Sequence, residues 1–332
     1  MLSPSDILHL PYTPDLTEGG IAYALRSLPY SFEYTDGKPY DRLRRMVAGV
    51  AVELAFRRYL SQQNIPFEVK APTPFTEHNK YTVSLGGRNC NIKSFLISHR
   101  DQIAEMRSNP SLMLEAPALV PSDHQSMNGY ADHDVYVFAF LSGLIAASQA
   151  NLQKAAATNQ PHYLIHMMPD EWRKPSTWHP LGPLALKSES DAGMLVEVSG
   201  QDEARGFLTR VVNLPAQKRV TIHDPFYSVT AIHVKNMPEA RLGIHSPFHK
   251  EAHVVPPLEW GNIWVYGMEI YLAGFISRAE FRQRAKLVAQ NSTVFQYAHT
   301  KTKNLGVPVS DLKPMHDLFA RVKEWAGRND ST

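Results

Sequence analysis

The sequence is poor in cysteine, with Cys90 alone among 332 residues. A single cysteine excludes an internal disulfide and a zinc site built from several cysteines. It fits a reducing compartment, so we expect a cytoplasmic protein. No apolar run approaches the roughly 18 residues of a membrane span. The start of the chain lacks a basic segment followed by an apolar run, which argues against a secretory signal. We therefore expect a soluble intracellular protein without a membrane partner.

The chain also lacks a strong excess of charge, because 34 Lys and Arg residues face 32 Asp and Glu residues, a net charge of +2. This balance neither demands nor forbids a nucleic-acid partner, and DNA would need the positive charge concentrated on one face. A Gly-rich phosphate loop and a Gly-x-Ser-x-Gly nucleophile motif are both missing from the sequence. The hydrophobic fraction of 43% is ordinary for a packed globular chain.

The clearest helix is predicted over Asp41 to Gln63, where apolar residues recur at helical spacing. Asn64 and Pro66 should end it. Its apolar positions are Leu43, Met46, Val47, Val50, Leu54 and Leu60.

A β-hairpin is predicted directly after this helix. Tyr81 to Leu85 alternates like a strand, Gly86 and Gly87 begin a turn, and Cys90 to Ile97 forms the next strand. Asp134 to Phe140 has the β-branched and aromatic content of a buried strand. We expect the helix to pack on a sheet made of these three strands.

The composition changes near Gln160, and several short strands are predicted between Leu184 and Val255. Ser277 and Glu280 form a capping box, which predicts a helix running to about Val288. A final helix is predicted over Leu312 to Trp325. We therefore expect an α/β domain over residues 1–158 and a β-rich domain with C-terminal helices over residues 159–332.

Metal-dependent phosphodiester hydrolysis needs hard oxygen ligands for Mg²⁺ and a nearby cation. A hairpin can supply both. In a hairpin built for this chemistry, one carboxylate stands on the first strand. A second carboxylate and a lysine stand two residues apart on the next strand, so they share one face.

The segment Gly49 to Phe56, the turn at Ile65 to Glu68, and the strands Tyr81 to Leu85 and Asn91 to Lys93 resemble the PD-(D/E)XK nuclease superfamily over about residues 41–141. The resemblance implies a restriction-endonuclease-like fold, with a mixed sheet flanked by helices, and Mg²⁺-dependent cleavage of DNA in a restriction or antiviral defence system. It carries Glu53 over as the helix glutamate and Lys93 as the motif lysine. Glu53 and Asn91 would then hold the metal.

Two positions depart from the superfamily pattern. Thr82 stands where the first-strand aspartate would be, and Asn91 stands where the second acid would be. An amide oxygen can bind a hard cation, but the two changes also fit a weakened or lost metal site. An inactivating substitution would look the same in the sequence.

Three interpretations therefore stay open. The chain is an active endonuclease, a non-catalytic nuclease-fold subunit that binds DNA or acts as a scaffold among protein partners, or an unrelated enzyme. Arg57, Arg58, Lys301 and Lys303 are the candidate phosphate contacts. In the non-functional interpretation, Glu53 is a helix-surface residue paired with Arg57.

Weaker candidates lie elsewhere. Asp134 precedes a strand, where an aspartate is usually a turn residue. His245, His249 and His253 are spaced by four, but Pro247 makes that segment a poor helix and the spacing a poor zinc signature.

Overall fold

The computed structural model describes residues 2–27, 39–69, 83–125, 131–146, 148–158, 163–264 and 266–329. The chain is mixed α/β and divides into two compact units. Unit 1 comprises Met1–Ile21, Arg45–Leu144 and Gly267–Thr332, and unit 2 comprises Ala22–Arg44 and Ile145–Tyr266. Each unit is described by itself. None of the helices in the described ranges combines the length and apolar character needed to cross a bilayer.

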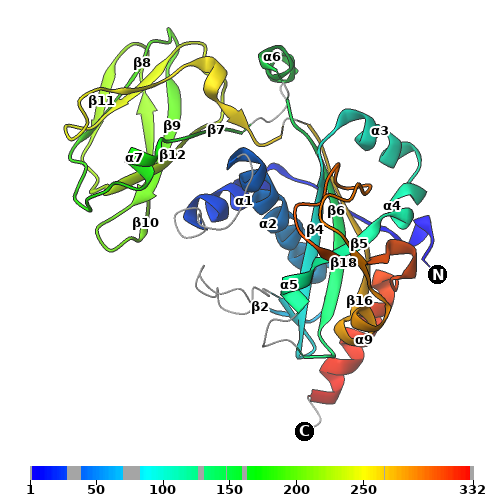
Figure 1. Ribbon diagram of the computed structural model, residues 1–332. Coiled ribbons are helices and arrows are strands. Elements are labelled where there is room, and N and C mark those ends of the chain that lie inside the picture. The colour runs from blue at the N-terminus through cyan, green and yellow to red at the C-terminus, as the bar shows by residue number, and fades with distance from the viewer. Residues whose placement is uncertain are drawn as a thin grey trace. The chain divides into compact units, whose positions relative to one another are not determined.

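Unit 1 is built on a mixed sheet with the strand order β1-β16-β6-β4-β3-β2 (Figure 1). Its long strands β4 and β6 run parallel, with Asn91 opposite Tyr136 and Lys93 opposite Phe138. β2, β3 and β4 are antiparallel neighbours. The strands are β1 (Leu8–Leu10), β2 (Glu68–Val69), β3 (Val83–Leu85), β4 (Arg88–Ile97), β6 (Val135–Leu144) and β16 (Tyr266–Ser277).

One face of this sheet is covered by helices α2 (Pro39–Gln62) and α9 (Met315–Asn329). A β-carbon added at Gly49 of α2 would lie 3.6 Å from Oγ of Ser94, which places α2 on the Ser94 side of β4. Phe56 of α2 stacks on Phe319 of α9, with ring centroids 6.4 Å apart. The helix expected over Asp41 to Gln63 is therefore present as α2, and it packs against β4, one of the three strands predicted beneath it.

Close approach between α1 (Pro14–Ser27) and α2 depends on glycine. A β-carbon at Gly20 would lie only 2.7 Å from the carbonyl oxygen of Val47, so any larger residue would push the helices apart. α1 and α2 thus pack as a tight helix pair.

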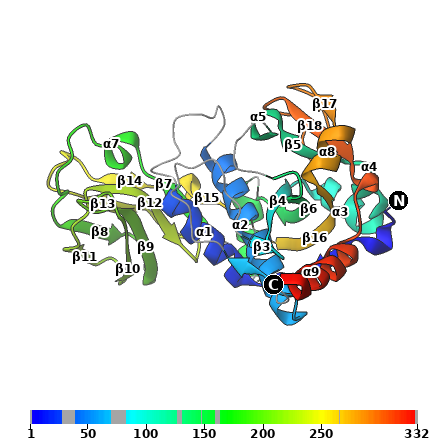
Figure 2. The ribbon, with the colours of Figure 1, turned by 90° about the horizontal axis from the view of Figure 1, so that it is seen from below.

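The opposite face of the sheet is covered by α8 (Arg278–Arg284) and by a small antiparallel sheet of β17 (Lys286–Val288), β18 (Asn304–Pro308) and β5 (Pro117–Pro121). Figure 2 shows this small sheet on one side of the large sheet and α9 on the other. Aromatic rings fill the layer between, and Phe138 stacks on Phe281 of α8. The remaining helices of unit 1 are α3 (Arg100–Ser108), α4 (Ser111–Glu115) and α5 (Ser122–Gln125).

Unit 2 is mainly β. A five-stranded sheet has the order β10-β9-β12-β7-β15 and a four-stranded sheet has the order β11-β8-β13-β14. The first contains β7 (Leu164–Met167), β9 (Met194–Gln201), β10 (Phe207–Leu214), β12 (Ser228–Val234) and β15 (Gly261–Asn262). The second contains β8 (Leu184–Ser188), β11 (Arg219–Ile222), β13 (Leu242–His245) and β14 (His253–Val255). The short helices are α6 (Gln149–Ala157) and α7 (Asp170–Arg173).

A histidine pair, with His166 buried and His253 half-buried, joins the two sheets of unit 2. Nε2 of His166 on β7 lies 2.9 Å from Nε2 of His253 on β14. Nδ1 of His166 donates to the carbonyl oxygen of Glu259, so His166 accepts at Nε2 and His253 donates. Burial lowers the pKa of both imidazoles, and for His166 the Glu259 carbonyl opposes that effect.

The division into two units differs from the single domain boundary near residue 158 that the sequence predicted. The chain leaves unit 1 after Leu144 of β6 and returns to it at Gly267 of β16, the neighbouring strand. The hydroxyl of Ser142 donates to the carbonyl oxygen of Gly267 over 2.6 Å, so the two crossing points lie together. Most of unit 2 is therefore an insertion between two adjacent strands of one sheet.

Other boundaries also differ from expectation. The capping box at Ser277 and Glu280 is present, but α8 ends at Arg284 rather than near Val288. Ala285 is extended, and β17 then pairs with β18, so a long-range strand contact replaces the last helical turn. The last helix begins at Met315 instead of Leu312, and β10 and β13 are not among the individual strands predicted between Leu184 and Val255.

Candidate functional site

The candidate site lies on the β3–β4 hairpin. Its two-residue turn consists of Gly86 and Gly87, with φ of +54° and +79°. Positive φ at both central residues matches the type I′ turn that favours glycine and tight hairpins. A β-carbon at Gly86 would lie 2.6 Å from Cβ of Trp325, so α9 also restricts this position. The hairpin is thus held in one register.

Asn91 and Lys93 share one face of β4 because side chains alternate along a strand. Their cross-strand partners on β6 are Tyr136 and Phe138. Nζ of Lys93 lies 5.9 Å from the centroid of the Tyr136 ring. Ile92 between them points to the face covered by α2.

Lys93 is half-buried, and burial lowers its pKa to about 8, while the carboxylate of Asp123 on α5 acts in the opposite direction. An ammonium that loses water but keeps a carboxylate nearby interacts more strongly with an incoming anion than an exposed lysine does. Lys93 is therefore a partly desolvated cation whose charge is supported by Asp123.

Glu53 takes a different place. Its helix α2 packs on the face of β4 that carries Ser94, opposite to the face of Asn91 and Lys93. Its carboxylate lies 3.5 Å from Arg57, one turn further along the helix. The structure thus brings Asn91 and Lys93 together, while Glu53 lies on the helix of the other face. Thr82 falls outside the described residues.

The donor set fits Mg²⁺ poorly. The amide of Asn91 carries no negative charge, and the Lys93 ammonium, two residues away on the same face, repels a cation. No group of three or more His, Cys, Asp or Glu side chains could hold a metal within the described ranges. A divalent cation prefers carboxylate oxygens, usually more than one.

Asp134 serves the framework of this site. Its carboxylate is only 3% exposed and accepts from the backbone N–H of Asn89 at 2.9 Å, the Asn89 amide at 3.2 Å and the N–H of Ala131 at 2.8 Å. It therefore ties the start of β6 to the start of β4.

Two of the basic residues predicted to contact phosphate form ion pairs within the chain instead. Arg58 of α2 pairs with Asp15 and donates to Thr13, and Arg57 pairs with Glu53. Lys303 is exposed. Asp123 was a weak site candidate from the sequence, but no local pattern links it to Lys93, because the two residues are 30 positions apart.

Comparison with known proteins gives no match: no family model, no curated protein and no solved structure is similar to this chain.

Proposed function

We propose that this chain is a nuclease-fold DNA-binding protein whose hairpin has lost the anionic ligands of a catalytic metal. The observation that carries the proposal is the placement of Asn91 and Lys93 on one face of β4. Support also comes from the hairpin β3–β4 following helix α2 and from the parallel pairing of β4 with β6 in a mixed sheet. The resemblance implies a mixed sheet flanked by helices, and the proposal takes the sheet of unit 1 to be that sheet.

In this proposal Lys93 contacts a backbone phosphate, and Asn91 adds an amide hydrogen bond beside it. Phosphate contacts by cations supply most sequence-independent affinity for DNA. The face is the one on which a metal-dependent relative would carry its acids, so loss of the acids leaves a lysine and a neutral amide at these positions. Binding should then need no divalent ion.

The test is binding of a fluorescent DNA duplex in EDTA and in Mg²⁺, for the natural chain, Lys93→Met and Lys323→Met. Lys93→Met keeps the side-chain length and removes the charge. Lys323 is an exposed lysine of α9, on the opposite face of the sheet, and serves as the matched control. We expect equal binding in EDTA and Mg²⁺, and weaker binding in Lys93→Met alone.

A second candidate is Mg²⁺-dependent DNA cleavage, for which Asp123, whose charge acts on Lys93, would be the carboxylate near the hairpin. A plasmid-nicking assay separates the two proposals. Nicking by the natural chain, lost in Asp123→Ala, would support cleavage. Nicking only in the double variant Thr82→Asp with Asn91→Asp would support a degenerate site.

A further inference from the structure

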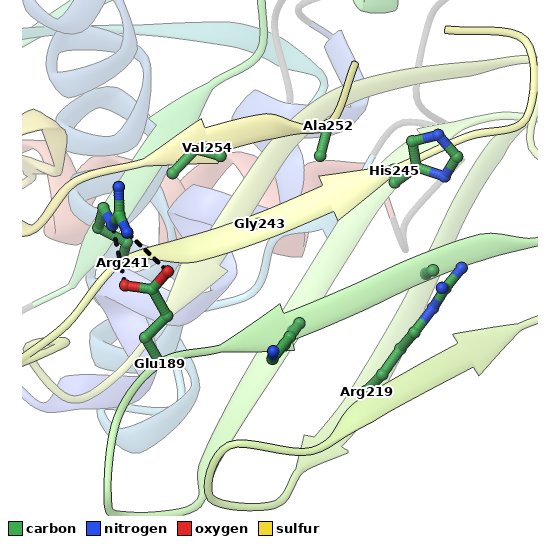
Figure 3. Close-up of a pocket in the computed structure, with 9 residues that line it drawn as sticks. Glu189, Arg219, Arg241, Gly243, His245, Ala252 and Val254 are labelled. Atoms are coloured by element: carbon green, nitrogen blue, oxygen red, sulfur yellow. Dashed lines mark hydrogen bonds and ion pairs between the residues drawn. The ribbon is translucent and has the colours of Figure 1, made fainter. Parts of the chain in front are cut away.

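The outer face of the four-stranded sheet in unit 2 forms a pocket of about 430 Å³ (Figure 3). Along β8 the side chains alternate, so Leu184, Leu186 and Ser188 are buried while Lys187 points outward. The outward residues of β11, β13 and β14 complete the lining. The volume falls in the range of about 300–1,000 Å³ that small-molecule sites occupy.

The floor of the pocket is small and largely apolar. Gly243 lies at its centre, paired with Lys187 on one side and Val254 on the other. A β-carbon at Gly243 would have the carbonyl oxygens of Lys187 and His253 as its nearest neighbours, at 3.9 and 4.0 Å. The hollow therefore exists because this residue has no side chain, and the backbone there would accept a larger one.

The rim is positively charged. Lys187, Arg219 and Arg241 contribute three positive charges to the lining, and Glu189 contributes one negative charge. Arg241 pairs with Glu189 through two hydrogen bonds of 2.8 Å, which fixes one end of the pocket. Figure 3 shows Arg219 and His245 at the other end.

Arg219 is the cation most available to a ligand. It lies opposite Lys187 in the strand register, and within the described part of the chain it has no ion pair with a carboxylate. Two adjacent cations, one with the planar fork of a guanidinium, match the oxygens of a phosphate group. No Phe, Tyr or Trp is among the described lining residues, so stacked bases of a single strand are not what this surface suits.

We propose that this pocket binds a phosphate ester of nucleotide size. The phosphate lies against Arg219 and Lys187, and the uncharged part of the ligand covers Gly243 and the apolar floor. The Glu189–Arg241 pair offers both a donor and an acceptor at the far end. This site belongs to unit 2 and stands independently of the DNA-binding proposal for β4.

The test is calorimetric titration of the full chain with ADP, with inorganic pyrophosphate and with a short DNA duplex. Saturable binding of ADP is expected. Arg219→Ala should weaken it about tenfold or more, because one charge-assisted contact is lost. Gly243→Val should abolish it by filling the floor without changing charge. Lys250→Ala, which removes an exposed lysine of unit 2 outside the pocket lining, should bind as the natural chain does.

Comparing the titrations also shows whether the bound phosphate belongs to a small ester or to a nucleic-acid backbone. Duplex binding without ADP binding, lost in Arg219→Ala but not in Lys93→Met, would assign the pocket to a nucleic-acid backbone. No binding of any probe, or equal binding in the natural chain and Arg219→Ala, would overturn the proposal. If Gly243→Val does not fold, as judged by circular dichroism, Arg219→Ala alone decides.

Discussion

Replacing Asp134 by alanine should destabilise unit 1 strongly. The change removes an acceptor of three hydrogen bonds, to the backbone and side chain of Asn89 and to the backbone of Ala131. A hydrogen bond to a charged group contributes about 1.5–3 kcal/mol. The three bonds are not additive because they share one carboxylate. We therefore expect a loss of about 3–5 kcal/mol in the free energy of unfolding.

Hydrogen exchange measured by mass spectrometry suits this prediction because it reports the stability of each unit separately. A global unfolding curve of a chain with two units need not be a single two-state transition. Peptides from β4 and β6 should lose protection in Asp134→Ala, while peptides from β9 and β12 of unit 2 serve as the internal reference. Asp132→Ala is the control, since its side chain is 66% exposed and pairs with Arg282 at the surface. Its expected cost is under about 1 kcal/mol. Equal protection in the two variants would refute the role assigned to Asp134.

Two further predictions concern the histidine pair and the hairpin turn. Burial lowers the pKa of His166 and His253 in the folded chain. As pH falls, these histidines therefore take up protons in the unfolded chain before they do so in the folded chain. Unit 2 should thus be most stable above the unfolded pKa of about 6.5 and lose stability below it, which urea titrations across that range can measure. His166→Phe should flatten that dependence, and an unchanged pH slope would contradict the assignment. Gly86→Ala should destabilise unit 1 by about 1–2 kcal/mol, because alanine is strained at positive φ. Its β-carbon would also collide with Trp325, so Trp325 should become more exposed. Unchanged quenching of tryptophan fluorescence by a soluble quencher would contradict this prediction.

The local elements were predictable because short-range patterns determine them. The period of the residues from Asp41 to Gln63 gave α2, and paired glycines gave the hairpin turn. The end of α8 was not predictable, because Lys286 to Val288 leave the helix to pair with β18, a strand remote in the sequence.

The site was predictable only in part, for a similar reason. The two-residue spacing placed Asn91 and Lys93 on one face of β4. Which face α2 covers depends on packing between distant segments, so the position of Glu53 could not be read from its helix alone. The pocket around Gly243 is assembled from four strands that only the folded chain brings together.

The most direct test of the account is the salt dependence of duplex binding by the natural chain and by Lys93→Met. Each phosphate contact contributes about 0.9 to the slope of log affinity against log salt concentration. The account predicts that Lys93→Met lowers the magnitude of this slope by about that amount, with Lys323→Met unchanged. Identical slopes and affinities for the natural chain and Lys93→Met would contradict the claim that this face of β4 binds DNA.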